Sequence, residues 1–149
     1  MEVKYEFDPL ELVGITADLT KAQRSAIMDE VAAYVQESVL SMIGDSKSPV
    51  TGRKFPLLSK EYAKEFHGGN RTSHLELEGD LLDSLVVKKK GNVLILTVSE
   101  DQQGKADGHN NFSGKSQLPL RQFIPKEDQT FVPSIREGIK SIIRDAIET

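Results

Sequence analysis

The stretch 20-TKAQRSAIMDEVAAYVQESVLSMIG-44 carries the strongest structural signal in the chain. Its apolar side chains recur at steps of three and four residues, which places one stripe on a helix: Ile27, Met28, Val31, Tyr34, Val35, Val39 and Met42. Thr20 and Gln23 have the spacing of a capping box, and Gly44 offers a left-handed stop. We therefore predict a helix over residues 21–43, about 34 Å long at 1.5 Å per residue.

A second amphipathic helix is predicted near the C-terminus. Pro133 suits a first helical turn, and an apolar stripe follows it: Ile135, Ile139, Ile142, Ile143, Ala146 and Ile147. Between the two helices, residues 84–90 and 93–99 are β-prone runs joined by Gly91-Asn92, a pair typical of hairpin turns. The alternation of Val3, Tyr5 and Phe7 with polar residues predicts a first strand.

The remaining segments are rich in residues that interrupt regular structure. Residues 46–59 contain three Pro or Gly residues and predict a loop extended over the surface, after which Ser59 caps a short helix that ends at Gly68-Gly69. A further one or two helical turns are expected within 77–85. Residues 100–117 predict a long polar loop, and 118–125 an edge strand between two prolines.

Together these elements predict one α+β domain over residues 1–149. The expected architecture is a small antiparallel β-sheet of three to four strands, packed against two long amphipathic helices, with extended loops. A chain of this length buries an adequate core without disulfides or structural metals.

Composition narrows the classes of function. The chain has 19 Lys and Arg against 23 Asp and Glu, a net charge of -4, which disfavours a surface that mainly neutralises nucleic-acid phosphates. It contains no Cys, which excludes disulfides, thiol catalysis and thiolate zinc sites. The sequence shows neither a signal-peptide pattern nor a run of apolar residues long enough to span a membrane, so we expect synthesis in the cytoplasm and no membrane partner.

The stretch GHNNFSGKS, residues 108–116, resembles a phosphate-binding P-loop but differs in two respects. Five residues instead of four separate Gly108 from Gly114, and the stretch leads toward Pro119 and a strand-like pattern instead of a helix. A P-loop needs a buried strand before it and a helix N-terminus after it to hold the phosphate. We therefore predict no nucleotide site.

Other candidate chemical groups lack supporting patterns. His67, His74 and His109 lie in Gly-rich segments without a spacing typical of metal ligands. Asp80 and Asp83 share one helical face, where a solvated charged surface explains them. No Ser nucleophile elbow occurs. The sequence predicts no catalytic residue, cofactor or metal, and we expect that the protein is not an enzyme.

Three segments in a fixed order carry a family resemblance. SPVTGRKFPLLSKEYAKEF, from Ser48, has the form Pro-x-x-Gly-x-x-aromatic-x-x-Leu-Ser followed by a Tyr-Ala helix. LELEGDLLDSLVV, from Leu75, contains Leu-x-Gly-x-Leu, a serine and an apolar run. HNNFSGKSQLPLRQFIP, from His109, joins a His and Gly stretch to Pro-x-Arg-x-Phe. Taken together, these segments resemble the tail-completion, or virion-morphogenesis, proteins of tailed bacteriophages.

The resemblance implies a structural virion protein of the phage neck, made in the host cytoplasm and acting in tail completion or head-to-tail joining. It implies a homo-oligomeric ring of six identical subunits that contacts connector, neck and tail proteins, while DNA passes through the channel without specific binding. The implied subunit and partner interface comprises Arg53, Phe55, His109, Phe112, Pro119, Arg121 and Phe123.

Within this interface the three Phe residues would be apolar anchors, and Arg121 would bind a carboxylate or backbone carbonyls. For Phe123 and Ile124, completion of the chain's own core is an equally weighted alternative. A tail terminator or connector stopper is an alternative function. A small DNA-binding protein or nuclease that uses Lys88–Lys90 and His109 is an alternative of another class.

Overall fold

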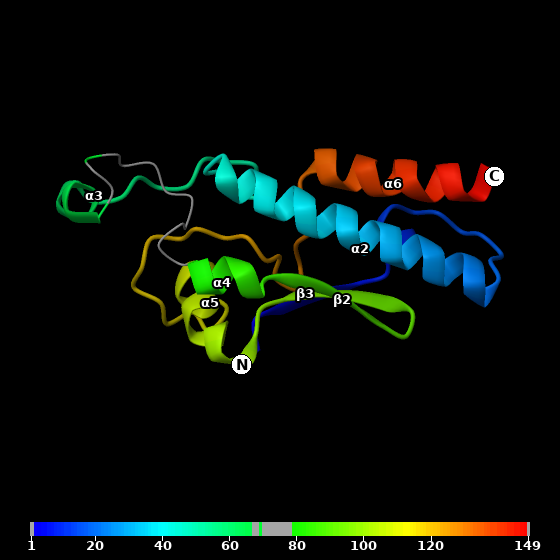
Figure 1. Ribbon diagram of the computed structural model, residues 1–149, viewed down its shortest axis with the longest axis horizontal. Helices are drawn as coiled ribbons and strands as arrows, with labels where there is room; N and C mark the ends of the chain where they lie inside the picture. Colours follow the sequence, from blue (N-terminus) through cyan, green and yellow to red (C-terminus); the bar gives the residue numbers. More distant parts are fainter. Residues whose placement is uncertain (1, 67–68, 70–78, 149) are drawn as a thin grey trace.

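A computed structural model describes residues 2–66, 69 and 79–148 and shows an α+β fold (Figure 1). The elements in chain order are β1 Lys4–Phe7, α1 Pro9–Leu12, α2 Lys21–Gly44, α3 Lys60–Phe66, α4 Gly79–Ser84, β2 Val86–Lys90, β3 Val93–Thr97, the 3-10 turn η2 Glu100–Gln102, α5 Gln103–Asn110 and α6 Pro133–Glu148. His67, His74 and Leu77, on which sequence predictions fell, lie outside the described residues.

The described part of the chain forms a three-stranded antiparallel sheet in the order β1-β3-β2. Tyr5 pairs with Leu96 and Phe7 with Leu94, so these four buried side chains share one face of the sheet. β2 and β3 form the predicted hairpin, in which Gly91 adopts a φ of 58° in the two-residue turn. The first strand and the hairpin are thereby confirmed.

Helix α2 lies over the sheet and packs against β2, β3 and α6 (Figure 1). Its predicted capping box is present, because Thr20 Oγ1 accepts from Gln23 N–H and Gln23 Oε1 accepts from Thr20 N–H. The predicted stop is displaced. Gly44 is the last helical residue, and the left-handed conformation falls on Ser46, with a φ of 59°.

The outer edge of β2 is partly covered by α2. Gln36 Oε1 accepts a hydrogen bond from the backbone N–H of Val87 at 3.1 Å. Lys89 Nζ bonds Asp29 Oδ1 and Ser25 Oγ, each at 2.8 Å. Side chains of α2 therefore bind both the backbone and a lysine of this edge strand.

Helix α6 begins at Pro133 as predicted and lies alongside α2, with Ile135, Ile139 and Ile143 buried. The expectation of two long helices is wrong, because α6 has 16 residues whereas α2 has 24. The ring of Tyr34 lies directly against Gly138, where a Cβ would overlap the tyrosine hydroxyl. This glycine therefore permits the close approach of the two helices.

Two predictions for residues 100–125 are wrong. The expected polar loop contains η2 and the eight-residue helix α5, which ends at Asn111 in the left-handed conformation, φ 53°. The expected edge strand at 118–125 is not a strand. Its backbone N–H groups at Phe123 and Ile124 donate instead to the buried side-chain oxygen of Asn110, at 2.7 and 2.9 Å. The side chain of Asn110 thus accepts the hydrogen bonds that a neighbouring strand would accept in a sheet.

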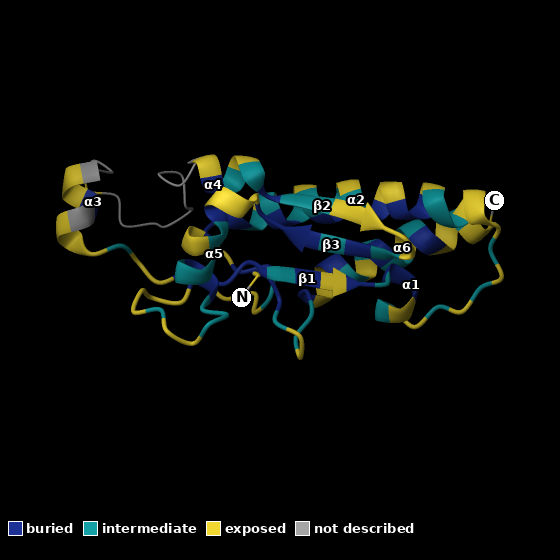
Figure 2. Ribbon diagram, turned by 90° about the horizontal axis from the view of Figure 1, so that it is seen from below, coloured by how far each residue is buried: buried dark blue, intermediate teal, exposed yellow. Residues whose placement is uncertain are grey.

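The core is one cluster whose buried residues run from Val3 to Ile143 and come from both ends of the chain (Figure 2). Of its described residues, α3 contributes none to this cluster. In its interior, Tyr5 stacks on Phe7 with ring centroids 5.3 Å apart, and Phe131 meets both rings edge-on at 5.4 and 5.5 Å. Within the described residues, none of the helices is both long enough and apolar enough to cross a bilayer.

The expected extended loop at 46–59 is only partly extended. Ser46 O accepts from Phe55 N–H at 2.7 Å and Ser48 N–H donates to Arg53 O at 2.9 Å, which closes residues 46–55 into a compact loop. Residues 56–59 then lead away from the body to α3, which lies beyond the end of α2 (Figure 1). The confirmed short helix α3 begins after Ser59, as predicted.

Candidate functional site

Two loops that are distant in sequence meet beside the C-terminal end of α2. They are residues 46–60, which we call the proline loop, and residues 108–126, which we call the polar loop. The proline loop contains most of the first sequence motif, and the polar loop contains the third. Buried side chains, those of Ser48 and Arg121, donate the hydrogen bonds that link the two loops. The site is therefore a surface composed of two ordered loops.

Arg121 joins the two loops through its guanidinium group. Nε and Nη2 donate to Pro56 O at 3.2 and 3.1 Å, and Nη2 also donates to Leu57 O at 3.3 Å. The side chain is only 6% exposed, and its own backbone N–H donates to His109 O. Charge-assisted bonds of this kind are stronger than neutral ones, so the base of the extended segment is held firmly.

Buried polar side chains add further links between the same loops. Ser48 Oγ donates to Gln122 O at 2.7 Å and accepts from the N–H groups of Val50 and Thr51 at 3.1 Å. Asn110, which is fully buried, donates from Nδ2 to Ala106 O while its oxygen accepts the two N–H groups described above. These bonds satisfy loop backbone that burial would otherwise leave unpaired.

The structure brings the predicted site residues into these two loops but exposes only some of them. Arg53 and Pro119 are exposed, and Phe112 is partly buried against the core. Four others are buried within the chain itself: Phe55, His109, Arg121 and Phe123. Phe123 and Ile124 complete the core, which was the alternative to an interface role, and Arg121 binds carbonyls of its own chain.

The exposed apolar groups of the site are leucines that the sequence analysis did not single out. Leu57, Leu118 and Leu120 are 57%, 55% and 51% exposed, and we call them the leucine surface. Arg121 binds the carbonyl of Leu57, so Leu57 lies close to Leu120, the residue before Arg121. Leu118 lies against Gly108. A signal was present: each of the three leucines adjoins a proline, a residue that interrupts regular structure.

Charge is distributed unevenly around this surface. The proline loop contains Lys47, Arg53, Lys54 and Lys60, and the polar loop contains Lys115, Arg121 and Lys126; neither loop contains an Asp or a Glu. Apart from buried Arg121, these cations lie at or near the surface. The two loops that carry the leucine surface are therefore basic, although the chain as a whole is acidic.

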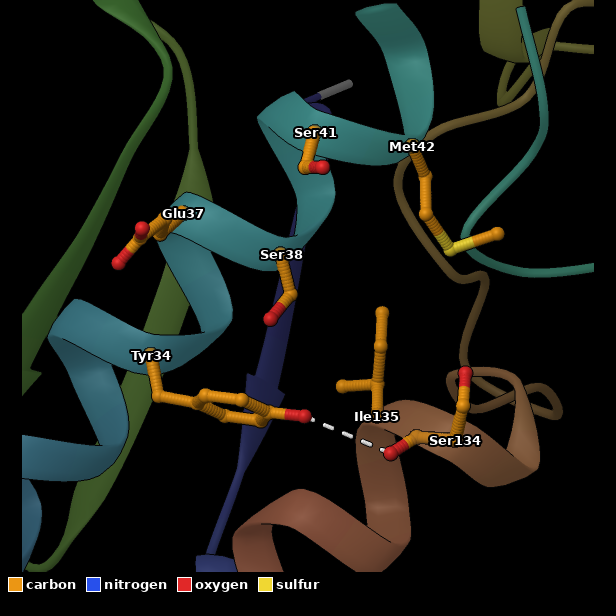
Figure 3. A pocket seen from close by; sticks show the side chains of 7 residues that line it. All are labelled: Tyr34, Glu37, Ser38, Ser41, Met42, Ser134 and Ile135. Carbon is orange, nitrogen blue, oxygen red and sulfur yellow. Dashed lines mark hydrogen bonds between the residues drawn. The ribbon is translucent and has the colours of Figure 1, made fainter. Parts of the chain in front are cut away.

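A separate hollow of about 370 Å³ lies between α2 and the start of α6 (Figure 3). Its lining residues are Tyr34, Glu37, Ser38, Ser41, Met42, Ser134 and Ile135. Across it, the Tyr34 hydroxyl donates to Ser134 O at 3.4 Å (Figure 3). The hollow is an open groove with a mixed lining, in which Met42 and Ile135 are apolar and Glu37 and three serines are polar.

Within the described part of the chain, the other candidate groups do not form a chemical site. In the P-loop-like stretch, Asn111 Oδ1 accepts from Ser116 N–H and Ser116 Oγ donates to Gly108 O, so the stretch closes on itself after a helix. Asp80 and Asp83 are exposed on α4. Among the residues that the structure describes, no three His, Cys, Asp or Glu side chains gather in a way that could hold a metal.

Asp107 and Ser113 close the same stretch from its other side. The hydroxyl and the backbone N–H of Ser113 donate to the Asp107 carboxylate at 2.7 and 2.8 Å. These bonds, that of the hydroxyl first, hold the pKa of Asp107 below its ordinary value. The carboxylate therefore acts as an anchor for the loop.

Comparison with known proteins gave no match to a family model, to a curated protein or to a solved structure. The functional interpretation accordingly depends on the residues and on the geometry of the two loops.

Proposed function

We propose that the protein is a structural subunit of the phage neck that acts in tail completion, or head-to-tail joining, as a ring of identical subunits. The proposal starts from the order of the three motifs between Pro49 and Pro125. The observation that supports it best is that the first and third motifs meet at Arg121 in one ordered surface with exposed leucines. Surfaces of this kind are typical of protein interfaces, not of reaction sites.

A closed ring repeats one heterologous contact, so each subunit needs two different patches. The leucine surface is one such patch, and the extended segment that leads to α3 carries its Leu57 side chain beyond the body of the subunit (Figure 1). We propose a hexamer in the virion neck that binds connector and tail proteins. The overall charge of -4 suits a channel through which DNA passes without adhering.

The mass of the purified protein tests this proposal. Light scattering after size-exclusion chromatography is expected to give six times the chain mass of 16.5 kDa, and electron microscopy to show rings. The measurement is repeated with the connector and tail proteins present, because docking can order the interface. A monomer under both conditions would refute the ring.

The position of the protein in the virion separates tail completion from the roles of terminator or stopper. Antibody labelling or particle imaging is expected to place the subunit between the connector and the tail. A location within the tail tube end, or within the connector itself, would favour a terminator or a stopper respectively.

A DNA-binding function is the second candidate, because Lys88 and Lys90 are exposed at the tip of the hairpin. Such binding depends steeply on salt concentration, since bound lysines release counterions from the phosphates. Retention of a duplex at low salt that is lost in a Lys88→Ala/Lys90→Ala variant would favour this candidate over the ring.

A further inference from the structure

We propose that the leucine surface of one subunit docks into the α2/α6 hollow of a second copy of this chain. This inference rests on the proposed ring and names the contact that would close it. Its elements are the three exposed leucines on the proline and polar loops, and the groove lined by Tyr34, Met42 and Ile135.

The leucine surface has a fixed shape before it meets a partner. Leu57 follows the carbonyl of Pro56 that Arg121 holds, and Leu120 precedes Arg121 itself. Because buried bonds fix both backbones, docking does not have to order them, which lowers the entropic cost of association. Leucines exposed on a rigid base are suited to fill a groove.

The hollow offers complementary walls. Met42 and Ile135 contribute one apolar side chain from each helix, and the ring of Tyr34 lies at one end (Figure 3). Ser38 and Ser41 add hydroxyl groups on the α2 side. None of the described residues that line it belongs to the proline or polar loop. The two patches are therefore distinct, as a head-to-tail contact requires.

Charge favours the same pairing. Among the described residues that line the hollow, Glu37 is the charged one, and α2 carries no Lys or Arg from Ser25 to its end at Gly44. The two loops around the leucines contain only cations. Opposite charges on two surfaces steer association and favour the pairing of the leucine surface with the hollow. Two leucine surfaces, each on cationic loops, would repel one another.

Positions 38 and 120 allow a direct test, because the chain has no native Cys. The variants Ser38→Cys and Leu120→Cys are purified separately, mixed and oxidised. The expected result is a disulfide-linked dimer in the mixture and none with either variant alone. A control that pairs Leu120→Cys with Ser141→Cys, on α6 but outside the hollow, is expected not to cross-link.

The outcomes separate this inference from the proposed function. A wild-type ring without cross-linking between positions 38 and 120 refutes the contact and leaves the ring standing. Cross-linking of Leu120→Cys with itself refutes it too, because the contact would then be symmetric. A wild-type chain that is monomeric under all conditions refutes both.

A second variant tests the contact without a cross-linker. Leu118→Asp/Leu120→Asp changes two exposed side chains, so the fold is retained, while self-association is expected to weaken roughly tenfold or more. Weaker association of the wild type at high salt is expected as well. Unchanged assembly of the double variant, or a DNA duplex that competes for the two loops and abolishes cross-linking, would overturn the proposal.

Discussion

Single buried polar residues determine how the two loops of the site are held. Asn110 is the clearest case, because one side-chain oxygen accepts two backbone N–H groups and the amide returns a bond to α5. An asparagine in a Gly- and Asn-rich stretch looks like an ordinary loop residue. Its partners lie 13 and 14 residues further along the chain, so this role could not be predicted from local pattern.

Replacing Asn110 with Ala tests this role. Two buried N–H donors would lose their acceptor, and each costs about 1–3 kcal/mol when left unpaired. The expected loss in the free energy of unfolding is therefore about 2–6 kcal/mol, measured by urea denaturation. Gln117→Ala, an exposed amide on the same loop, is the control and should change it by less than about 0.5 kcal/mol.

The Asp107 anchor predicts a dependence on pH. The carboxylate has a lowered pKa in the folded protein, so its contribution is complete above the ordinary pKa of Asp and is lost as the pH falls through the lowered value. The amide resonance of Ser113 should therefore shift at acidic pH, below the range in which an ordinary Asp titrates. Asp107→Asn should abolish this transition, and an amide that does not titrate in the wild type would contradict the assignment.

Other residue roles were partly accessible from sequence. The capping box of Thr20 and Gln23 is local, since the two residues are three positions apart, and it was predicted correctly. Backbone carbonyls were among the expected partners of Arg121, but the carbonyls prove to belong to its own chain, 64 and 65 residues away. A role could be predicted from the sequence when the partners were close along the chain, and not when they were far apart, whatever the residue type.

Elements with a strong period were the predictable ones. α2, α6 and β1 each bury one regular face, and that face is visible in the sequence as steps of three, four or two residues. The hairpin was predictable from its Gly91-Asn92 turn. α5 was missed because its sequence, QGKADGHN, contains two glycines and little apolar surface. Its stability comes from burial of Ala106 and Asn110 under the polar loop, which is a tertiary effect.

The packing of α2 on α6 predicts a specific effect of Gly138→Ala. The new methyl group would collide with Tyr34, and overpacking of this kind costs about 1–3 kcal/mol. Alanine favours a helix over glycine by about 1 kcal/mol, so the net loss should be at the lower end of that range. Thermal unfolding monitored by circular dichroism measures it.

A double variant isolates the cause. Tyr34→Ala/Gly138→Ala has no collision, so Gly138→Ala should stabilise the protein in the Tyr34→Ala background by up to about 1 kcal/mol. The same loss in both backgrounds would show that the methyl group meets something other than the tyrosine.

At the scale of the whole molecule, the core forms one cluster and not two. It contains β1 at one end of the sequence and α6 at the other, and Phe131 packs edge-on against both Tyr5 and Phe7 of β1. The absence of Trp leaves tyrosine fluorescence as a convenient probe, and Tyr5 reports on the N-terminal strand. Urea unfolding followed by tyrosine fluorescence and by far-ultraviolet circular dichroism should therefore give coincident transitions. An earlier fluorescence transition would show that an element carrying Tyr5, Tyr34 or Tyr62 unfolds separately from the rest.

The hydrogen bond from Val87 to Gln36 has a consequence for crowded assemblies. An uncovered edge strand can pair with a strand of another chain and so start aggregation. Here the side chain of Gln36 already accepts the hydrogen bond from the outward-facing N–H of Val87. At this position of β2, strand addition by a second copy is consequently disfavoured when copies gather at high local concentration.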